Sequence, residues 1–273
     1  YKNIDFDVRS YKKLKMFLHA EAQTGNNLYD DDLTCFIRIG SDYTQNYYEY
    51  EIPMKVTPQG AYDNSSSDAR KIVWNPLNNM EIDFENLQNL KQKRNSDKFK
   101  GTADLMHRYP KTATEASITD ANGNIRYVYV KGNPNLSAVK TIMIGIRNQK
   151  QTGEREDDGM AKCAEVWINE LRLSDFDEKG GWASTARVTT KLADLGTLTL
   201  SGNYSTPGWG SIEKKVSERQ RETKYQYDIT SQLQLHKFIP SGWGINLPMY
   251  VGYSEAVIKP QYNPLDPDIL LTP

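Results

Sequence analysis

The sequence contains no long hydrophobic run. Only 38% of its 273 residues are hydrophobic and the mean hydropathy is −0.70, whereas a membrane-spanning helix needs about 18 or more consecutive apolar residues. The composition therefore excludes a helical membrane protein. A transmembrane β-barrel stays open, because about half of the residues in each barrel strand are polar and an average hydropathy hides them.

Cysteine, histidine and net charge are sparse as well. The chain holds two cysteines and three histidines, and its net charge of −1 gives no electrostatic reason to expect a nucleic-acid partner. Cys35 and Cys163 are far apart and in no metal-binding spacing, so we expect two buried thiols within strands, with a disulfide as the lesser alternative. His19, His107 and His236 share no motif, and we expect each at the surface.

Catalytic signatures are also missing. The sequence has no nucleophile elbow, zinc-ligand spacing or phosphate-binding loop, because its glycine-containing stretches lack the strand–loop–helix context that such sites need. We therefore predict no catalytic residue, no cofactor and no metal. Residues 1–5 carry neither a basic n-region nor an apolar h-region, and no initiating Met, so we interpret the sequence as an internal segment of a longer protein.

What the sequence has is tyrosine, with 17 residues, and a regular alternation of polar and apolar residues. The alternation is clearest near the C-terminal end. From Tyr225 to Leu235, every second residue falls on one face, and five of these six residues are apolar. Successive side chains of a strand point to opposite faces, so this run predicts a strand with one apolar and one polar side.

Three further runs repeat this pattern. One, from Ile245 to Tyr253, follows the turn-rich segment 240–244, and the other two form a predicted hairpin over 184–204 with a tight turn at 194–196. A highly charged segment, 206–223, is expected to be a solvated loop between the hairpins. Runs of about ten residues suffice for tilted strands to cross a bilayer. The side chains predicted to face lipid are Ala186, Val188, Leu192, Leu198, Leu200, Tyr225, Tyr227, Ile229, Leu233, Leu235, Ile245, Leu247, Met249, Val251 and Tyr253.

Three Gly-Trp pairs lie near the ends of these predicted strands. Their indoles, Trp182, Trp209 and Trp243, match the aromatic belt that membrane proteins place at the lipid–water interface. The alternative is that each indole simply packs beside a loop.

The first half of the chain predicts a β-sandwich with a small helical insert. We expect strands over residues 12–22, 33–40, 47–56, 116–119, 125–130, 138–147 and 163–173, with loops over 59–68 and 95–112. Residues 81–94 carry a loose helical stripe, acidic early and basic late, which suits the helix dipole. The segment 177–181 predicts a boundary between domains 1–177 and 178–273. The fold class is therefore all-β: a jelly-roll-like sandwich, then antiparallel strands of a large transmembrane β-barrel.

Two kinds of ligand stay open for this half. Acidic clusters at residues 30–32, 154–158 and 175–178 could bind calcium, although clustered acids in loops are more often solvated. Aromatic side chains could instead stack on a sugar, although the alternating Tyr48 and Tyr50 fit packing on a sheet better. The aromatic set is Tyr47, Tyr48, Tyr50, Trp74 and Trp167.

Several short motifs resemble one known family. They are VWINELRLSDF at 166–176, GGWA at 180–183, LADLG at 192–196, STPGWGS at 205–211, LPMY at 247–250 and YNPLDPD at 262–268. Together they are similar to the SprA/Sov family, the outer-membrane translocon of the Bacteroidetes type IX secretion system, also called the gliding motility protein. The similarity is strongest over about 163–269, and members of that family are far longer than this chain.

The resemblance implies a segment of a very large barrel that passes folded cargo across the outer membrane of a Gram-negative bacterium. The implied partners are outer-membrane lipid, the remaining strands of the same full-length protein, secreted cargo proteins and accessory secretion-system subunits. A soluble sandwich inserted between strands would cap or line the pore. The alternative is a soluble cell-surface β-sandwich module that binds glycan or a protein partner, whose apolar faces would be buried against a second sheet.

Overall fold

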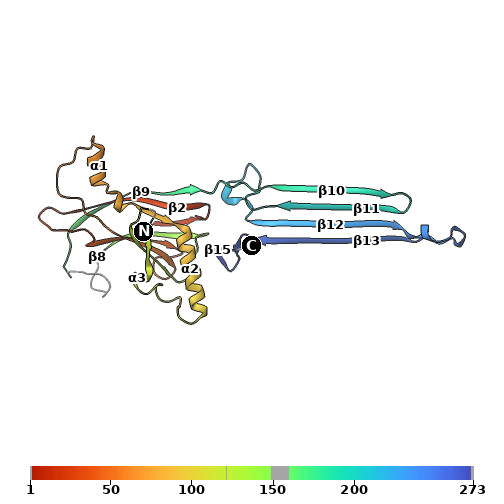
Figure 1. Cartoon of the computed structure of the whole chain (residues 1–273), viewed down its shortest axis with the longest axis horizontal. Coiled ribbons are helices and arrows are strands. Elements are labelled where there is room, and N and C mark those ends of the chain that lie inside the picture. Colours follow the sequence, from red (N-terminus) through yellow and green to blue (C-terminus); the bar gives the residue numbers. More distant parts are fainter. Residues whose placement is uncertain (1, 121, 149–159, 272–273) are drawn as a thin grey trace. The chain divides into compact units, whose positions relative to one another are not determined.

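The computed structural model describes residues 2–120, 122–148 and 160–271, which form two compact units (Figure 1). Unit 1 comprises Tyr1–Asp177 together with Asp266–Ile269, and unit 2 comprises Glu178–Leu265 with Leu270–Pro273. The secondary structure is mostly β, with 48% strand and 15% helix in several open antiparallel sheets. Among the described residues, no helix is long and apolar enough to cross a membrane.

Unit 1 contains two antiparallel sheets. The larger has the strand order β1-β8-β3-β4-β7-β6 and the smaller has the order β5-β2-β9. The strands are β1 (Lys2–Phe6), β2 (Tyr11–Ala22), β3 (Leu33–Gly40), β4 (Tyr47–Pro53), β5 (Met80–Asp83), β6 (Ser117–Thr119), β7 (Ile125–Lys131), β8 (Val139–Asn148) and β9 (Ala164–Phe176). The strands predicted in this half are confirmed with shifts at their ends, since the strand predicted over 47–56 stops at Pro53, whereas β1 and β5 were not anticipated.

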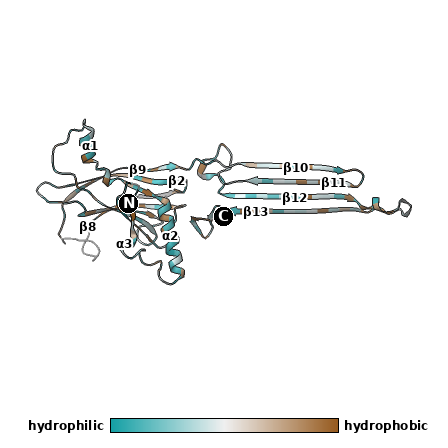
Figure 2. Ribbon diagram, viewed as in Figure 1, coloured by the Kyte–Doolittle hydropathy of each residue, from teal (hydrophilic) through white to brown (hydrophobic). Residues whose placement is uncertain are grey.

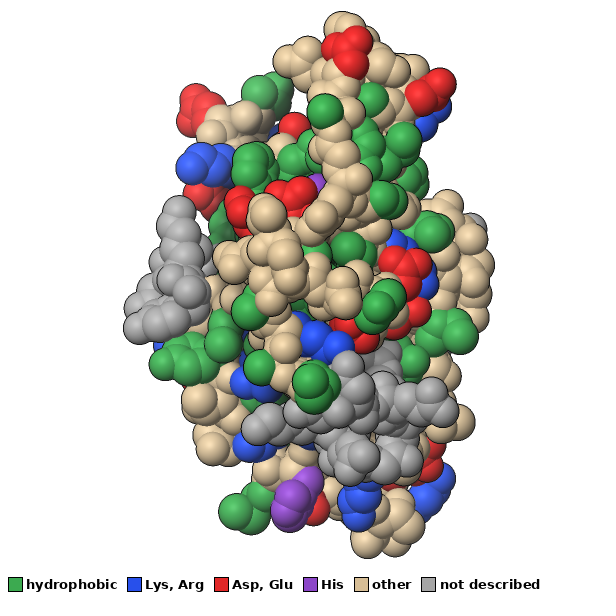
Figure 3. Space-filling model, turned by 90° about the vertical axis from the view of Figure 1, so that its left-hand side faces the viewer, with side chains coloured by type: hydrophobic (Ala, Val, Ile, Leu, Met, Phe, Trp, Pro, Cys, Tyr) green, Lys and Arg blue, Asp and Glu red, His purple; other side chains and the backbone are tan. Residues whose placement is uncertain are grey.

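Both sheets of unit 1 bury their apolar side chains in one core. In β2, Leu14, Met16 and Leu18 are buried while Lys15 and Phe17 between them are only partly buried, as a two-residue period requires. The same period in β4 sends Tyr48 into the core shared with β2, β3, β5 and β7. Unit 1 therefore has an apolar interior of its own, and on the face drawn in Figure 3 its acidic and basic side chains are interspersed.

Short helices complete unit 1: α1 (Ser67–Val73), the 3₁₀ turn η1 (Pro76–Asn78), α2 (Phe84–Phe99) and α3 (Ala113–Ala116). The predicted helix at 81–94 begins later and ends later than expected. Asp83 is extended and caps α2 by accepting a hydrogen bond of 2.9 Å from the Glu85 amide, so the residues before it pair with β2 instead. The helix then runs to Phe99, inside the segment predicted as a loop.

Unit 2 is built on one sheet with the strand order β10-β11-β12-β13. Its strands are β10 (Ala183–Leu192), β11 (Gly196–Ser205), β12 (Glu222–Gln234) and β13 (Pro248–Pro260), and hydropathy varies along them residue by residue (Figure 2). The connections contain η2 (Val216–Glu218), η3 (Leu235–Phe238) and η4 (Ser241–Trp243), and β14 (Tyr262–Asn263) and β15 (Asp266–Leu270) follow. Each strand is antiparallel to the next, as the predicted hairpins require.

The chain leaves unit 1 at Asp177 and returns to it at Asp266, and both points lie beside the adjacent residues Arg9 and Ser10. The Asp177 amide donates to the Ser10 carbonyl over 2.7 Å, and Arg9 Nη1 donates to the Pro267 carbonyl over 3.1 Å. The hairpins of unit 2 are thus an insertion into the sequence of unit 1. Hydrogen bonds to Arg9 and Ser10 fix the chain just before and just after this insertion.

Candidate functional site

The register of β10–β13 gathers apolar side chains on one face of the sheet. Val188 lies opposite Leu200, Leu200 opposite Ile229, and Ile229 opposite Tyr253. Directly opposed residues of an antiparallel ladder point to the same side, so these four form one apolar row across the sheet. Further rows on this side are Thr190, Leu198, Ser231 and Val251, then Leu192, Gly196, Leu233 and Met249. We call this side the apolar face.

Within the described part of the chain, the apolar face stays exposed. Relative exposure is 59% for Val188, 41% for both Leu200 and Ile229, and 56% for Tyr253. Large apolar side chains grouped on one exposed face are unusual in a soluble monomer and mark a surface that contacts protein or lipid.

The opposite side, which we call the polar face, carries mostly Thr, Ser, Asn and Gln. The Thr185 hydroxyl donates to Asn203 Oδ1 over 2.9 Å, and the hydroxyls of Thr189 and Thr199 lie 3.3 Å apart. In the row between these two pairs, the Ser254 hydroxyl donates to the Asp228 carboxylate over 2.5 Å. Tyr250 also lies on this face, opposite Gln232. The sheet thus has one mostly apolar face and one mostly polar face.

One carboxylate breaks the pattern of the apolar face. Glu255 lies opposite Tyr227, whose hydroxyl donates to it, and the Tyr253 hydroxyl donates to it over 3.0 Å. The two phenol hydroxyls thus provide the hydrogen bonds that a carboxylate needs on an apolar face. This row lies toward the end of the sheet that carries Trp182.

Tryptophans stand beyond both ends of the four strands. Trp182 precedes β10 and Trp209 follows β11, so they share one end, while Trp243 lies in η4 at the other. Their exposures are 57%, 47% and 70%. The rings of Trp182 and Tyr204 are in contact, tilted by 37° with their centroids 4.9 Å apart.

The glycines of two Gly-Trp pairs have a packing role. A Cβ added to Gly181 would meet the Trp209 amide nitrogen at 2.0 Å, and Gly208 has a φ of +86°. The Thr206 amide also donates to the Trp182 carbonyl over 3.0 Å. These contacts hold Trp182 and Trp209 in neighbouring segments, and only glycine fits both positions.

Most of the side chains predicted to face lipid share the apolar face, but three lie outside the strands. Leu235 belongs to η3, and Ile245 and Leu247 precede β13. The prediction that these three continue the strands is therefore wrong. Regular pairing ends at Gln234 and Pro248 because the backbone turns into η3 at Leu235, although the Leu235 amide still donates to the Leu247 carbonyl over 2.9 Å.

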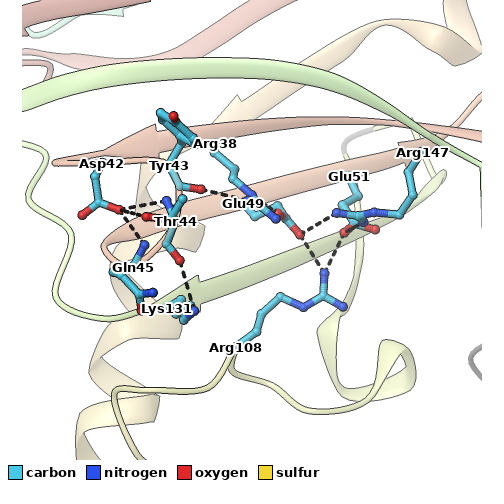
Figure 4. Close-up of polar contacts among 10 residues, drawn as sticks. All are labelled: Arg38, Asp42, Tyr43, Thr44, Gln45, Glu49, Glu51, Arg108, Lys131 and Arg147. Carbon is cyan, nitrogen blue, oxygen red and sulfur yellow. Dashed lines mark hydrogen bonds and ion pairs between the residues drawn. The ribbon is translucent and has the colours of Figure 1, made fainter. Parts of the chain in front are cut away.

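A charged network on the outer face of the large sheet was not anticipated (Figure 4). Glu49 and Glu51 alternate with the core tyrosines of β4 and are 0% and 2% exposed. Arg108 Nη1 donates to them over 2.7 and 3.0 Å, Arg147 binds both, and Arg38 binds Glu49. The available signal in the sequence was two glutamates, two residues apart, that alternate with the tyrosines of a predicted strand.

The network sets the charges of its carboxylates. Burial alone would raise the pKa of Glu49, but the hydrogen bond with Glu51 and the Arg38, Arg147 and Arg108 guanidinium groups lower that pKa to about 2. Burial and the neighbouring Glu49 raise the pKa of Glu51. Charged Glu49 is therefore a fixed counterion, and this face keeps an excess of guanidinium charge.

A second buried network ties the returning segment to unit 1. Lys91, which is 1% exposed, donates to Asp266 Oδ1 over 2.5 Å and to Asp268 Oδ2 over 3.2 Å. Asp268 also accepts from the Tyr48 hydroxyl over 2.7 Å and from the Leu136 amide over 2.6 Å. Burial raises the pKa of Asp268, against the opposing effect of Lys91 and the hydrogen bonds. We call this network the return latch.

The described residues do not form either of the two ligand sites that the sequence left open. Tyr47, Tyr48 and Tyr50 are buried, Trp74 is half-buried, and only Trp167 of the aromatic set is exposed, so no sugar-stacking platform results. Across the described residues, no group of three or more His, Cys, Asp or Glu could hold a metal ion. The acidic cluster at 154–158 lies outside the described residues.

Histidine and cysteine positions required corrections. His19 is buried, not exposed, because the segment around α1 covers the outer side of β2: its Nδ1 lies 2.7 Å from the Val73 carbonyl, and the centroid of the tilted Trp74 ring lies 6.0 Å from that of the imidazole. His107 is exposed as expected, whereas His236 is half-buried in η3 rather than fully at the surface.

The two cysteines are free, which excludes a disulfide between them in this structure. Cys35 is buried in β3 as predicted, and its burial raises its thiol pKa to about 12. Cys163 is exposed just before β9, so the expectation of a second buried thiol within a strand is wrong.

Comparison with known families now bears on these surfaces. The SprA_N family, described as "Motility related/secretion protein", matches residues 1–273, which is the whole chain. No curated protein matches the sequence. The chain therefore belongs to the SprA_N family, a family of secretion and motility proteins and not of enzymes.

Proposed function

We propose that this member of the SprA_N family is a segment of a protein-conducting translocon in the outer membrane of a Gram-negative bacterium. In this proposal β10–β13 are four consecutive strands of a large transmembrane barrel. The apolar face contacts lipid, and the polar face lines a water-filled interior through which folded cargo passes. Unit 1 is a soluble sandwich domain of the same protein, and β10–β13 are inserted into its sequence between Asp177 and Asp266.

The observation that carries the proposal is the division of one exposed sheet into an apolar and a polar face. A barrel strand alternates lipid-facing apolar residues with polar residues that face the interior. β10 and β11 have ten residues each. At about 3.4 Å per residue and a tilt of about 45°, such strands rise about 24 Å, close to the ~25 Å apolar band of outer-membrane barrels.

The tryptophans at the strand ends support the same placement. Interfacial Trp and Tyr form girdles at both surfaces of a bilayer. Trp182 and Trp209 would lie in one girdle and Trp243 in the other, with Tyr204 beside Trp182. Tyr227 and Tyr253 would solvate Glu255 close to the first girdle.

The free edges of the sheet indicate the partner. Among the described residues, β10 pairs only with β11 and β13 pairs only with β12. Unpaired backbone groups cannot remain in hydrocarbon, where each costs several kcal/mol. We therefore propose that further strands of the same full-length protein pair with both edges. The other partners in this proposal are secreted cargo and accessory secretion-system subunits.

A soluble module that binds glycan is less well supported. It needs a second layer over the apolar face and an exposed aromatic platform, whereas Tyr48 and Tyr50 are 1% and 3% exposed. The two readings also differ over what the polar face meets, since only a translocon brings exported protein to it.

Site-specific photo-crosslinking in cells tests the proposal. A photoreactive amino acid is placed at Thr199 on the polar face, or at its neighbour Leu200 on the apolar face, in the full-length protein. A known exported protein, fused to a domain that stalls in transit, is the probe. We expect a crosslink to the stalled protein from Thr199 and none from Leu200. Equal crosslinking from both positions, or none from either, would contradict the proposal.

A further inference from the structure

The core of unit 1 contains a buried ammonium group whose counterions come after β10–β13 in the sequence. Lys91 of α2 is 1% exposed, and it donates to the Pro134 carbonyl over 2.7 Å. Among the described residues, the only carboxylates within ion-pair distance of Lys91 are those of Asp266 and Asp268. The described part of residues 1–177 thus buries a positive charge and leaves its neutralisation to the segment that returns from unit 2.

Two neutral donors of the same core also depend on the returning segment. The Tyr48 hydroxyl donates to Asp268 Oδ2 over 2.7 Å, and the Leu136 amide donates to Asp268 Oδ1 over 2.6 Å. Both residues are buried, so water cannot take the place of Asp268 in the closed core. A buried donor left without its acceptor costs the full free energy of its desolvation. Three buried donors, one of them charged, therefore share a carboxylate that the chain supplies only on its return.

The returning segment is itself part of the core and not a strap on the surface. The side chain of Asp268 is 0% exposed and that of Asp266 is 13% exposed. Asn95 of α2 donates to Asp266 Oδ2 over 3.0 Å, and Arg9 donates to the Pro267 carbonyl over 3.1 Å. Each of these three consecutive residues thus has a partner in unit 1, and the segment fits one position there.

The order of the sequence gives these contacts a consequence for assembly. During synthesis, domains generally fold as units and the N-terminal one folds first. Unit 1 departs from this order, because Asp266 follows the whole of β10–β13. Breaking a buried ion pair by removing one partner is strongly destabilising, since it leaves an uncompensated charge in the interior. Before the chain returns, a closed unit 1 would carry that penalty at Lys91.

We infer that the return latch makes closure of unit 1 conditional on the return of the chain from unit 2. The sandwich closes after the hairpins have been synthesised, and it closes by taking in Asp266 and Asp268. Until then, unit 1 stays open around Lys91 and its ammonium group remains hydrated. The inference concerns the contacts of unit 1 and the order of the sequence, so it stands whether or not the apolar face of unit 2 contacts lipid.

Thiol labelling during synthesis tests this order. The full-length protein is synthesised in vitro with Cys163 and every cysteine outside residues 1–273 replaced by serine. Cys35 is 0% exposed in the core, so a bulky maleimide reaches it only while unit 1 is open. Growing chains are labelled briefly and then separated by length on a gel. We expect Cys35 to react in every chain that has not yet released Asp268 from the ribosome, and to be protected in longer chains.

Variants of the completed chain test the cause. Asp266→Asn combined with Asp268→Asn leaves Lys91 buried without a counterion, and should raise the labelling rate of Cys35 about 100-fold or more. Adding Lys91→Met removes the unpaired charge and should recover most of the protection. Asp68→Asn, at an acid whose side chain is 86% exposed, should leave the rate unchanged.

Three results would each overturn the inference. The first is protection of Cys35 in chains too short to have released Asp266. The second is a completed double variant that is as well protected as the unmodified protein. The third is a triple variant, with Lys91→Met, that labels as fast as the double variant, because the buried charge would then not control closure.

Discussion

Replacing Leu200 with arginine should destabilise the membrane-inserted sheet, whereas the same change at Thr199 should have little effect. Leu200 is the fifth of ten residues in β11 and lies between Val188 and Ile229 in the apolar row. In the proposed barrel it is therefore near the bilayer midplane. Arginine on a lipid face at that depth costs about 2–4 kcal/mol, which lowers the folding equilibrium constant about 30- to 1000-fold.

Thr199 provides the matched control. It precedes Leu200 in the same strand, but it lies opposite Thr189 and Thr230 on the polar face. An arginine there remains in water in the proposed barrel, so the expected change is within about 0.5 kcal/mol, as for an ordinary surface substitution. Both changes introduce arginine at adjacent positions of one strand. The two variants therefore differ mainly in which face of the sheet carries the arginine.

The assay is reversible urea unfolding of the full-length protein in phospholipid vesicles, followed by heat-modifiable mobility on gels. We expect Leu200→Arg to lower the free energy of unfolding by the stated amount, and Ile229→Arg to do the same. Equal effects at Leu200 and Thr199 would refute the reasoning, because the cost would then not depend on which face meets lipid.

Three other changes test the account at separate points. Lys91→Met should lower the free energy of unfolding by about 3–5 kcal/mol in urea titration, because it leaves the buried Asp268 carboxylate without its counterion. Glu49→Gln should cost up to about 3 kcal/mol at pH 7: the charged form of Glu49, with its pKa lowered to about 2, contributes fully above about pH 4.5 and loses its contribution as the pH falls toward 2. Gly196→Ala should impair pairing of β11 with β12, seen as a lower melting temperature, since its Cβ would lie 1.9 Å from the Gln232 carbonyl oxygen, whereas Gly202→Ala meets no atom closer than 3.7 Å and should be tolerated.

Each of these changes has a control or a contrary outcome. Lys71→Met removes an exposed partner of Asp68 and should change stability by less than about 1 kcal/mol. A Lys91 variant no weaker than the Lys71 variant would show that the return latch does not stabilise unit 1. If the cost of Glu49→Gln were the same at pH 2.5 and pH 7, the charge of Glu49 would not be the stabilising feature.

The alternation in unit 2 could be predicted from sequence because it is local. A strand places alternate residues on opposite faces whatever its neighbours do, so the side of Leu200 or Ile229 follows from its own segment. The residue at which a strand ends cannot be read from the alternation of polar and apolar residues alone. Leu235 and Leu247 keep the apolar pattern, but the ladder stops at Gln234 because the backbone turns into η3 at Leu235.

What the sequence could not predict is nonlocal. Lys91 meets Asp268 across 177 residues of chain, and no periodicity links them. His19 lies on the polar side of β2 by its period, yet α1 and Trp74 cover it. Glu49 and Glu51 were visible as an alternating pair, but Arg108 reaches them from a distant loop. Burial of polar groups depends on such partners.

The most direct test of the two-faced sheet is the environment of single nitroxide labels. Ile229→Cys and Thr230→Cys, each in a Cys163→Ser background, place labels on adjacent residues of β12 that face opposite sides. Electron paramagnetic resonance then compares relaxation by oxygen, which enriches in lipid, with relaxation by a water-soluble nickel chelate. The account predicts that the label at 229 responds to oxygen and the label at 230 to nickel. A label at 229 that neither reagent reaches would mean that the apolar face is buried against protein, and would contradict the account.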